Sequence, residues 1–189
     1  PDGCYPGLTT AEGCNALSHL TSGAANTGLG WYALFGTSTG SSNTGVGAGA
    51  LVLNNSDSNT AVGTAALLLN TAGTGNSALG TSAMVNNDNG SNNTAVGSFA
   101  LQNNINGSDI IAVGAEAGTN PDLITNNVYI GDPGFAGDEN VISIGGVAAS
   151  GTPYELTFIG GIYNADVTTD ALPVYIDGDG HLGTNPVVP

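Results

Sequence analysis

A five-residue unit recurs along the chain and constrains its fold more than any other feature. At residues 59–63 it reads Asn-Thr-Ala-Val-Gly, and related units end on nine glycines. These anchor glycines are Gly13, Gly30, Gly47, Gly63, Gly80, Gly97, Gly114, Gly131 and Gly145. Successive anchor glycines lie about 17 residues apart, except that one step is a single residue shorter and the last step is three shorter. A short, fixed period of this kind is the signature of a solenoid, in which each repeat forms one coil.

The columns of the repeat predict one short strand in each coil. Thr or Ser stands three residues before most anchor glycines, and Val, Leu or Ile stands directly before them. Asn stands four residues before the glycine at Asn26, Asn43, Asn59, Asn76, Asn93 and Asn127. Because strand side chains alternate, Thr and the aliphatic residue share one face, and Asn shares the other with a small residue. Stacked coils therefore predict an Asn ladder, in which each amide hydrogen-bonds to the next.

A second pair of columns follows the anchor glycine. Most coils place Ala and Leu three and four residues after it, as at Ala66 and Leu67. The residues around this pair do not alternate and favour helix, so we expect a helical turn here, with a plain second strand as the alternative. The predicted fold is thus a repeat solenoid, mainly β, of the parallel β-roll or β-helix type with coils of about 17 residues.

The charge of the chain excludes two classes of partner. Its 189 residues include no Lys or Arg, and the formal net charge is −15. Binding to nucleic acid or to an anionic membrane surface needs cationic side chains opposite the phosphates. We therefore expect no nucleic-acid partner and no membrane insertion.

The chain divides into three predicted segments. Residues 1–25 read as an N-terminal cap, in which Cys4 and Cys14 are predicted to form a disulfide and Glu12 replaces the aliphatic residue assigned to the core. Residues 26–108 form the regular repeats. Residues 109–189 contain strands that are apolar on both faces, and we expect another copy of the chain to cover them in an intertwined homotrimer. A single thin solenoid also buries little apolar surface for the entropy it loses on folding, which favours association.

No sequence pattern points to catalysis or to a cofactor. Asp177 and Asp179 could share a calcium ion, but a hairpin turn explains them better, so no metal is predicted. Asp132, Asp138 and Glu139 form a second acidic group, interpreted as a solvated loop unless three copies meet there. Neither group has a partnered His or nucleophile.

Isolated aromatic residues have two interpretations each. Trp31, Tyr32 and Phe35 interrupt a chain of small residues near the cap. Packing of the cap is the favoured role, and contact with a carbohydrate or a partner is the alternative. His19 and His181 are interpreted as surface or packing residues.

The repeated unit resembles the glycine-anchored head repeats of trimeric autotransporter adhesins and related repeats of phage tail fibres. Residues 128–134, 139–146, 157–164 and 173–184 are similar to the segment that precedes an endosialidase-type intramolecular chaperone. In that family the chaperone assembles three chains and then cuts itself off before a Ser-Ser-x-Arg motif that follows Leu-Gly-Thr. Here Leu182-Gly183-Thr184 is present and the Ser-Ser-x-Arg motif is not. A mature, released product would have this ending, and so would a truncated chain.

These resemblances cover about residues 9–184. They imply a homotrimer, an extracellular or surface-displayed fibre, and no catalysis. The expected function is that of a structural subunit of an extracellular fibre or adhesin, whose trimers could join end to end and meet a surface or glycan receptor. The alternative is an ice- or polysaccharide-binding solenoid that uses the row formed by Thr10, Thr27, Thr44, Thr60 and Thr94.

Overall fold

The computed structural model describes residues 7–120, 125–145, 175–176 and 182–183. The chain forms two units, Pro1–Glu155 and Leu156–Pro189. The first unit contains nine three-residue strands: β1 (Thr10–Glu12), β2 (Thr27–Leu29), β3 (Thr44–Val46), β4 (Thr60–Val62), β5 (Ser77–Leu79), β6 (Thr94–Val96), β7 (Ile111–Val113), β8 (Val128–Ile130) and β9 (Ile142–Ile144). The described part of the chain contains no helix, and so no apolar helix that could cross a membrane.

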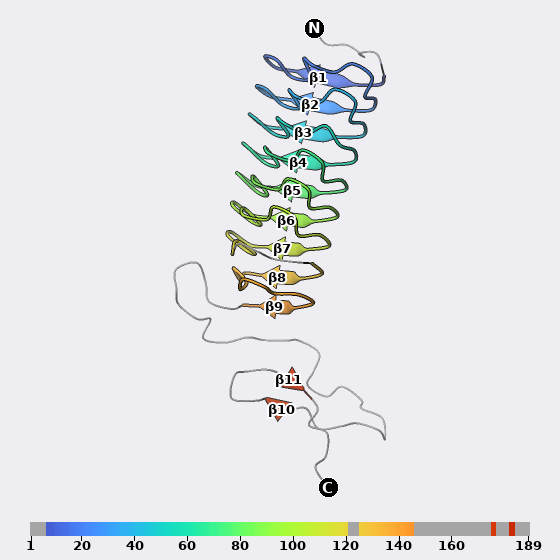
Figure 1. The fold of residues 1–189 in the computed structure, drawn as a ribbon. Helices are drawn as coiled ribbons and strands as arrows, with labels where there is room; N and C mark the ends of the chain where they lie inside the picture. The colour runs from blue at the N-terminus through green and yellow to red at the C-terminus, as the bar shows by residue number, and fades with distance from the viewer. Residues whose placement is uncertain (1–6, 121–124, 146–174, 177–181, 184–189) are drawn as a thin grey trace, which may run out of the picture. The chain divides into compact units, whose positions relative to one another are not determined.

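The nine strands form one parallel sheet in chain order, with each strand one coil after the last (Figure 1). Like residues are stacked on like: Thr27 pairs with Thr44, and Leu29 pairs with Val46. The shorter coil that follows keeps this register, because Thr44 still pairs with Thr60. The missing residue is therefore absorbed in the connection and not in the strand. The predicted parallel β-solenoid with coils of about 17 residues is confirmed.

An anchor glycine ends each strand of this sheet, and all nine have positive φ values. Close stacking makes the smallest residue necessary as well. A Cβ atom built on Gly80, where φ is +141°, would lie 2.4 Å from the carbonyl oxygen of Gly97 in the next coil. The corner therefore needs glycine both for its left-handed backbone and for its contact with the neighbouring corner.

The second pair of columns forms neither the expected helical turn nor a strand. It lies in consecutive tight turns, in which Leu51, Leu67 and Met84 have left-handed φ values of 55°, 50° and 51°. The amide of Leu67 donates to the carbonyl oxygen of Ala83 in the next coil, at 3.0 Å. Because these amides bond between coils, they are not available for the bonds within a helix. The need to turn back within a short coil thus overrides the helix propensity of Ala and Leu.

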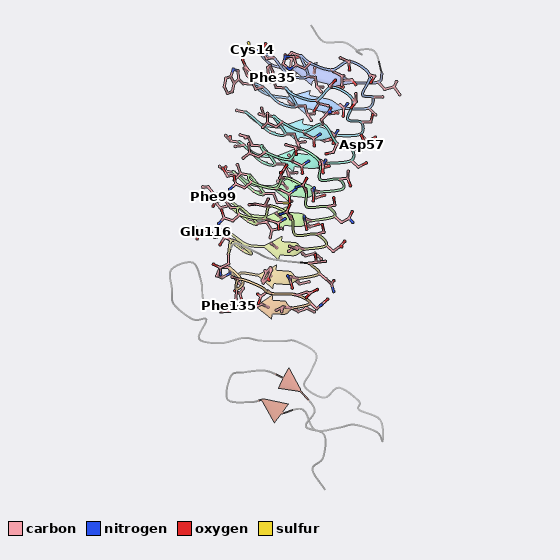
Figure 2. All side chains as sticks on the ribbon, viewed as in Figure 1. Cys14, Phe35, Asp57, Phe99, Glu116 and Phe135 are labelled. Carbon is pink, nitrogen blue, oxygen red and sulfur yellow. The ribbon has the colours of Figure 1, made fainter. Side chains whose placement is uncertain are left out.

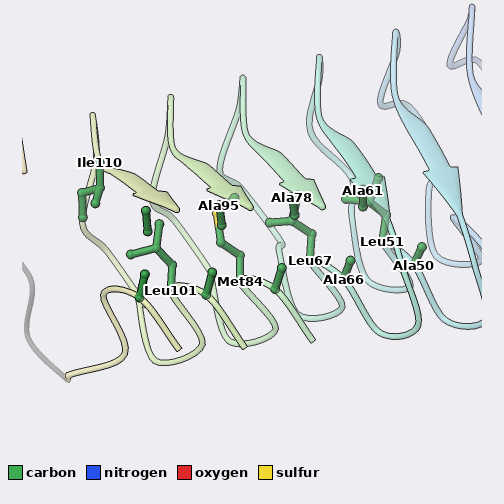
Figure 3. Close-up of a cluster of buried hydrophobic side chains, with 14 of the residues drawn as sticks. Ala50, Leu51, Ala61, Ala66, Leu67, Ala78, Met84, Ala95, Leu101 and Ile110 are labelled. Atoms are coloured by element: carbon green, nitrogen blue, oxygen red, sulfur yellow. The ribbon is translucent and has the colours of Figure 1, made fainter. Parts of the chain in front are cut away.

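The core lies between the sheet and these turns (Figure 3). Small residues of the strands, such as Ala61, Ala78 and Ala95, point inward and contact Leu or Met side chains from the turns. Tyr129 in β8 is the largest of the buried side chains. The aliphatic residue before each anchor glycine is not part of this core, so its assignment to the core was wrong: Leu29 and Leu79 are 44% and 51% exposed.

The second unit contains β10 (Tyr175–Ile176) and β11 (Leu182–Gly183). These strands are antiparallel, with Ile176 paired to Leu182. The pairing agrees with the predicted hairpin. Asp177, Asp179 and His181 lie outside the described residues.

Candidate functional site

Buried asparagines connect the coils along one side of the solenoid interior. The backbone nitrogen of Asn43 donates to Asn26 Oδ1 at 2.9 Å, and the backbone nitrogen of Asn59 donates to Asn43 Oδ1 at 2.9 Å. The same side chains donate through Nδ2 to carbonyl oxygens one coil further on, as from Asn26 to Gly40 at 2.8 Å. The ladder therefore consists mainly of hydrogen bonds between an Asn side chain and the backbone, with fewer bonds between two Asn side chains.

Ile110 interrupts this ladder between Asn93 and Asn127. Its backbone nitrogen still donates to Asn93 Oδ1 at 3.0 Å, but its side chain offers no acceptor for the next coil. Asn127 is fully buried and resumes the pattern, accepting from Val141 N at 2.9 Å.

A second ladder, which the sequence interpretation missed, runs beside the first through Asn54, Asn70, Asn87 and Asn104. Each of the last three donates from Nδ2 to Oδ1 of the one before, at 2.7, 2.7 and 2.8 Å. The signal was present in the sequence, since each of these residues lies seven positions after an anchor glycine. Both ladders are buried, and apart from Asn104 Oδ1 at the end of the second ladder their side-chain oxygens and nitrogens are hydrogen-bonded within the chain. We infer that they stabilise the coils.

The outer face of the nine-stranded sheet is a candidate interaction surface. It consists of two parallel rows, a Thr row and an aliphatic row. The Thr row contains Thr10, Thr27, Thr44, Thr60, Ser77 and Thr94 and continues as Ile111, Val128 and Ile142. The aliphatic row contains Leu29, Val46, Val62, Leu79, Val96, Val113, Ile130 and Ile144, with Glu12 in the first coil. No described segment of this unit covers the residues, and Ile142 is 74% exposed.

The composition of the outer face changes along the sheet. From β2 to β6 a polar row lies beside an apolar one, whereas in β7–β9 both rows are aliphatic. Ile111, Ile130 and Ile144 are 45%, 41% and 52% exposed there. An uncovered apolar surface of this extent is typical of a surface that binds another molecule.

Two acidic residues after β8, Asp132 and Asp138, hold a turn together, which corrects their interpretation as part of a solvated loop. Asp132 is only 3% exposed, accepts from Gly134 N at 2.8 Å and is bonded by the Ser143 hydroxyl. Asp138 Oδ2 accepts from the Tyr129 hydroxyl and from Phe135 N, both at 2.9 Å. Carboxylates need donors once they are taken out of water, and this turn supplies backbone and hydroxyl donors in place of cations. Glu139 remains exposed.

The burial and hydrogen bonding of this turn change the pKa of Tyr129. Burial raises the pKa of its phenol, and the hydrogen bond to Asp138 and the negative charges of Asp138 and Asp132 raise the pKa further. The group is therefore a neutral hydrogen-bond donor over the physiological range and not a base. Among the described residues, no three His, Cys, Asp or Glu side chains are placed to hold a metal ion.

The two cysteines were predicted to be paired. Cys14 is a free and exposed cysteine in this structure, so the predicted disulfide is not seen. Cys4 lies outside the described residues.

Four aromatic residues form a cluster on the turns of the first two coils. We call His19, Trp31, Tyr32 and Phe35 the aromatic cluster. The ring centroids of His19 and Phe35 are 4.2 Å apart, those of Tyr32 and Phe35 are 4.6 Å apart, and those of Trp31 and Tyr32 are 4.4 Å apart. Trp31 is 60% exposed. Figure 2 shows Phe35 and Cys14 on the same edge of the stack, with Asp57 on the opposite edge.

The fold and these surfaces define the class of the protein as a parallel β-solenoid with an amide-lined interior and an apolar outer face. Comparisons with protein-family models, with curated proteins and with solved structures found no match to this chain.

Proposed function

We propose that this chain is a non-catalytic structural subunit of an extracellular homotrimeric fibre or adhesin. The observation that carries the proposal is the outer face, whose aliphatic row is at least partly exposed along the sheet and becomes two rows in β7–β9. Full burial of one such side chain is worth about 1.5–3 kcal/mol, so covering this face would be strongly favourable. A second and a third copy are suitable partners, because every copy presents the same rows, uncharged from β2 to β9, at the same spacing from coil to coil.

Three features support a structural role over a chemical one. The polar groups of the interior, the two Asn ladders, are buried and bonded to each other or to the backbone. The buried carboxylate of Asp132 is occupied in fixing a turn. The resemblance to adhesin heads and tail fibres supports the trimeric state and the extracellular location.

Replacing part of the outer face tests the proposal. The triple variant Ile111→Thr, Val128→Thr, Ile142→Thr extends the Thr row of β1–β6 into β7–β9. Six coils already carry Thr or Ser in this column, so each chain should keep its fold. The matched control, Leu53→Thr, Leu69→Thr, Ile105→Thr, removes three exposed aliphatic side chains away from the outer face.

Mass measured by light scattering after gel filtration distinguishes the outcomes. We expect the native chain and the control to form trimers. The outer-face variant should dissociate to monomers at protein concentrations at which the native chain is still trimeric. A native chain that stays monomeric over the whole concentration range would refute the trimer, and an equal effect of both variants would refute the assignment of this face.

The alternative function uses the same face. Thr10, Thr60 and Ser77 are exposed on β1, β4 and β5, and successive members of the row lie about 4.8 Å apart. This row could bind ice or a polysaccharide only if the face is not covered by other copies. A monomeric chain that produces thermal hysteresis in freezing solutions would favour the ice-binding version over the fibre.

A further inference from the structure

The aromatic cluster is not required to close its coil. In the third coil the columns of Trp31, Tyr32 and Phe35 are occupied by Ala48, Gly49 and Val52. The backbone contacts of the two coils are nevertheless the same: Tyr32 N donates to Cys14 O at 3.0 Å, and Gly49 N donates to Trp31 O at 2.8 Å. Small residues therefore build this turn equally well, and the rings are an addition to it.

Packing of the cap does not account for the cluster either. It explains the contacts that Tyr32 and Phe35 make with their neighbours, since both are half-buried. It does not explain why Trp31 remains 60% exposed or why His19 is exposed at the other end of the row of rings. A row of contacting rings that is exposed at both ends is typical of a place where a second molecule binds.

The charges around the cluster restrict what that molecule can be. Residues 7–56 contain one acidic residue, Glu12, and the whole chain contains no Lys or Arg. Glu12 lies in β1, outside the turns that carry the rings. An anionic ligand would find no Lys or Arg, and a cationic ligand would find no carboxylate in these turns. The surface therefore fits an uncharged ligand.

We infer that the aromatic cluster of His19, Trp31, Tyr32 and Phe35 is a binding site for a neutral oligosaccharide. The C–H faces of a sugar ring are apolar and stack on aromatic side chains, while its hydroxyls need polar partners at the edge. Asn15, Ser18 and His19 are exposed polar residues of the first coil, where Asn15 and Ser18 occupy the columns of Tyr32 and Phe35. The site lies on the turn edge and not on the outer face, so the inference does not depend on trimer formation.

A variant that converts the second coil to the sequence of the third provides the test. Trp31→Ala, Tyr32→Gly and Phe35→Val reproduce Ala48, Gly49 and Val52. Gly49 has a φ of +69° where Tyr32 has +58°, so this backbone accepts glycine. The matched control is Phe99→Ala, which removes a half-exposed ring in the same column as Tyr32 but four coils away.

Cellotetraose, maltotetraose, tetra-N-acetylchitotetraose and a sulfated tetrasaccharide serve as probes, with binding measured by calorimetry. The native chain offers a second signal, because Trp31 is its only tryptophan. We expect at least one neutral probe to bind saturably and to change the Trp31 emission. The coil variant should weaken this binding about tenfold or more, as expected for a lost stacking contact, and Phe99→Ala should not change it.

Two further measurements make the outcomes decisive. Circular dichroism checks that the coil variant retains its β structure, and the single variant Trp31→Ala replaces it if it does not. Mass in solution shows whether trimer formation is unchanged, which separates failure of this site from failure of the fibre. Absence of binding by all three neutral probes, equal binding by the variant, or binding of the sulfated probe alone would overturn the inference.

Discussion

Two physical requirements for glycine, a positive φ value and close contact with the next coil, can be separated by comparing an anchor glycine with another glycine. Both Gly80 and Gly137 have positive φ values, +141° and +87°. A Cβ atom on Gly80 would meet the Gly97 backbone, whereas a Cβ atom on Gly137 would meet nothing within 4 Å. Backbone strain acts at both positions, but the clash between coils acts only at the anchor glycine.

We therefore predict unequal effects of the same substitution. Gly137→Ala should lower the free energy of unfolding by about 1 kcal/mol, the cost of a left-handed non-glycine residue. Gly80→Ala should lower it by about 3 kcal/mol or more, because the backbones of two coils must also move apart. Urea denaturation followed by circular dichroism measures both. Equal losses would show that the tight contact between the corners carries no energy.

At the scale of the element, β8 and the turn that follows it form one hydrogen-bonded unit around Tyr129. The raised pKa of this phenol means that the folded chain favours its neutral form. The stability that this group contributes is therefore fully present below the unfolded pKa of tyrosine, about 10, and is lost as the pH rises above that value.

Tyr129→Phe tests this dependence. At neutral pH the variant should be less stable by about 1–3 kcal/mol, because Asp138 loses a hydrogen-bond donor. The difference in unfolding free energy between the two proteins should narrow as the pH rises beyond about 10. Above this pH the unsubstituted protein loses the Tyr129 proton when it unfolds, and the variant has no such proton to lose. A difference that stays constant from neutral to strongly alkaline pH would contradict the assigned cause.

At the scale of the first unit, stability should depend on contacts between neighbouring coils. Each strand pairs only with the strands directly before and after it in the chain. Such solenoids behave as sums of repeat and neighbour terms, so the number of coils is less critical than their register.

Deleting whole and partial coils separates the two factors. Removal of residues 64–80 joins Gly63 to Thr81 and takes out one whole coil with the register intact. We expect this chain to fold, with a modest fall in the unfolding midpoint. Removal of residues 64–71 should abolish cooperative unfolding of the stack, because the next strand can no longer reach its partner. Similar melting curves for the two deletions would argue against a register-dependent solenoid.

The period in the sequence by itself determined most of the architecture. The regular step between anchor glycines decides which residues lie above one another, and the alternation within Asn59–Val62 decides which of them share a face. Parallel stacking, the short strands and the position of the Asn column follow from this one-dimensional pattern.

Only the tertiary structure decided which face is inside and how the coil turns back. Hydrophobicity favours Val over Ala for the core, but the interior is narrow: a Cβ atom added to Gly28 would already lie 3.1 Å from the Leu17 side chain. Space for only small residues opposite Leu places Ala61 inward and leaves Val62 outside. The left-handed turns at Leu67 and the burial of Asp132 arise from contacts between coils. Those contacts form only when each coil folds back and packs on the next coil, and the sequence of one repeat does not contain them.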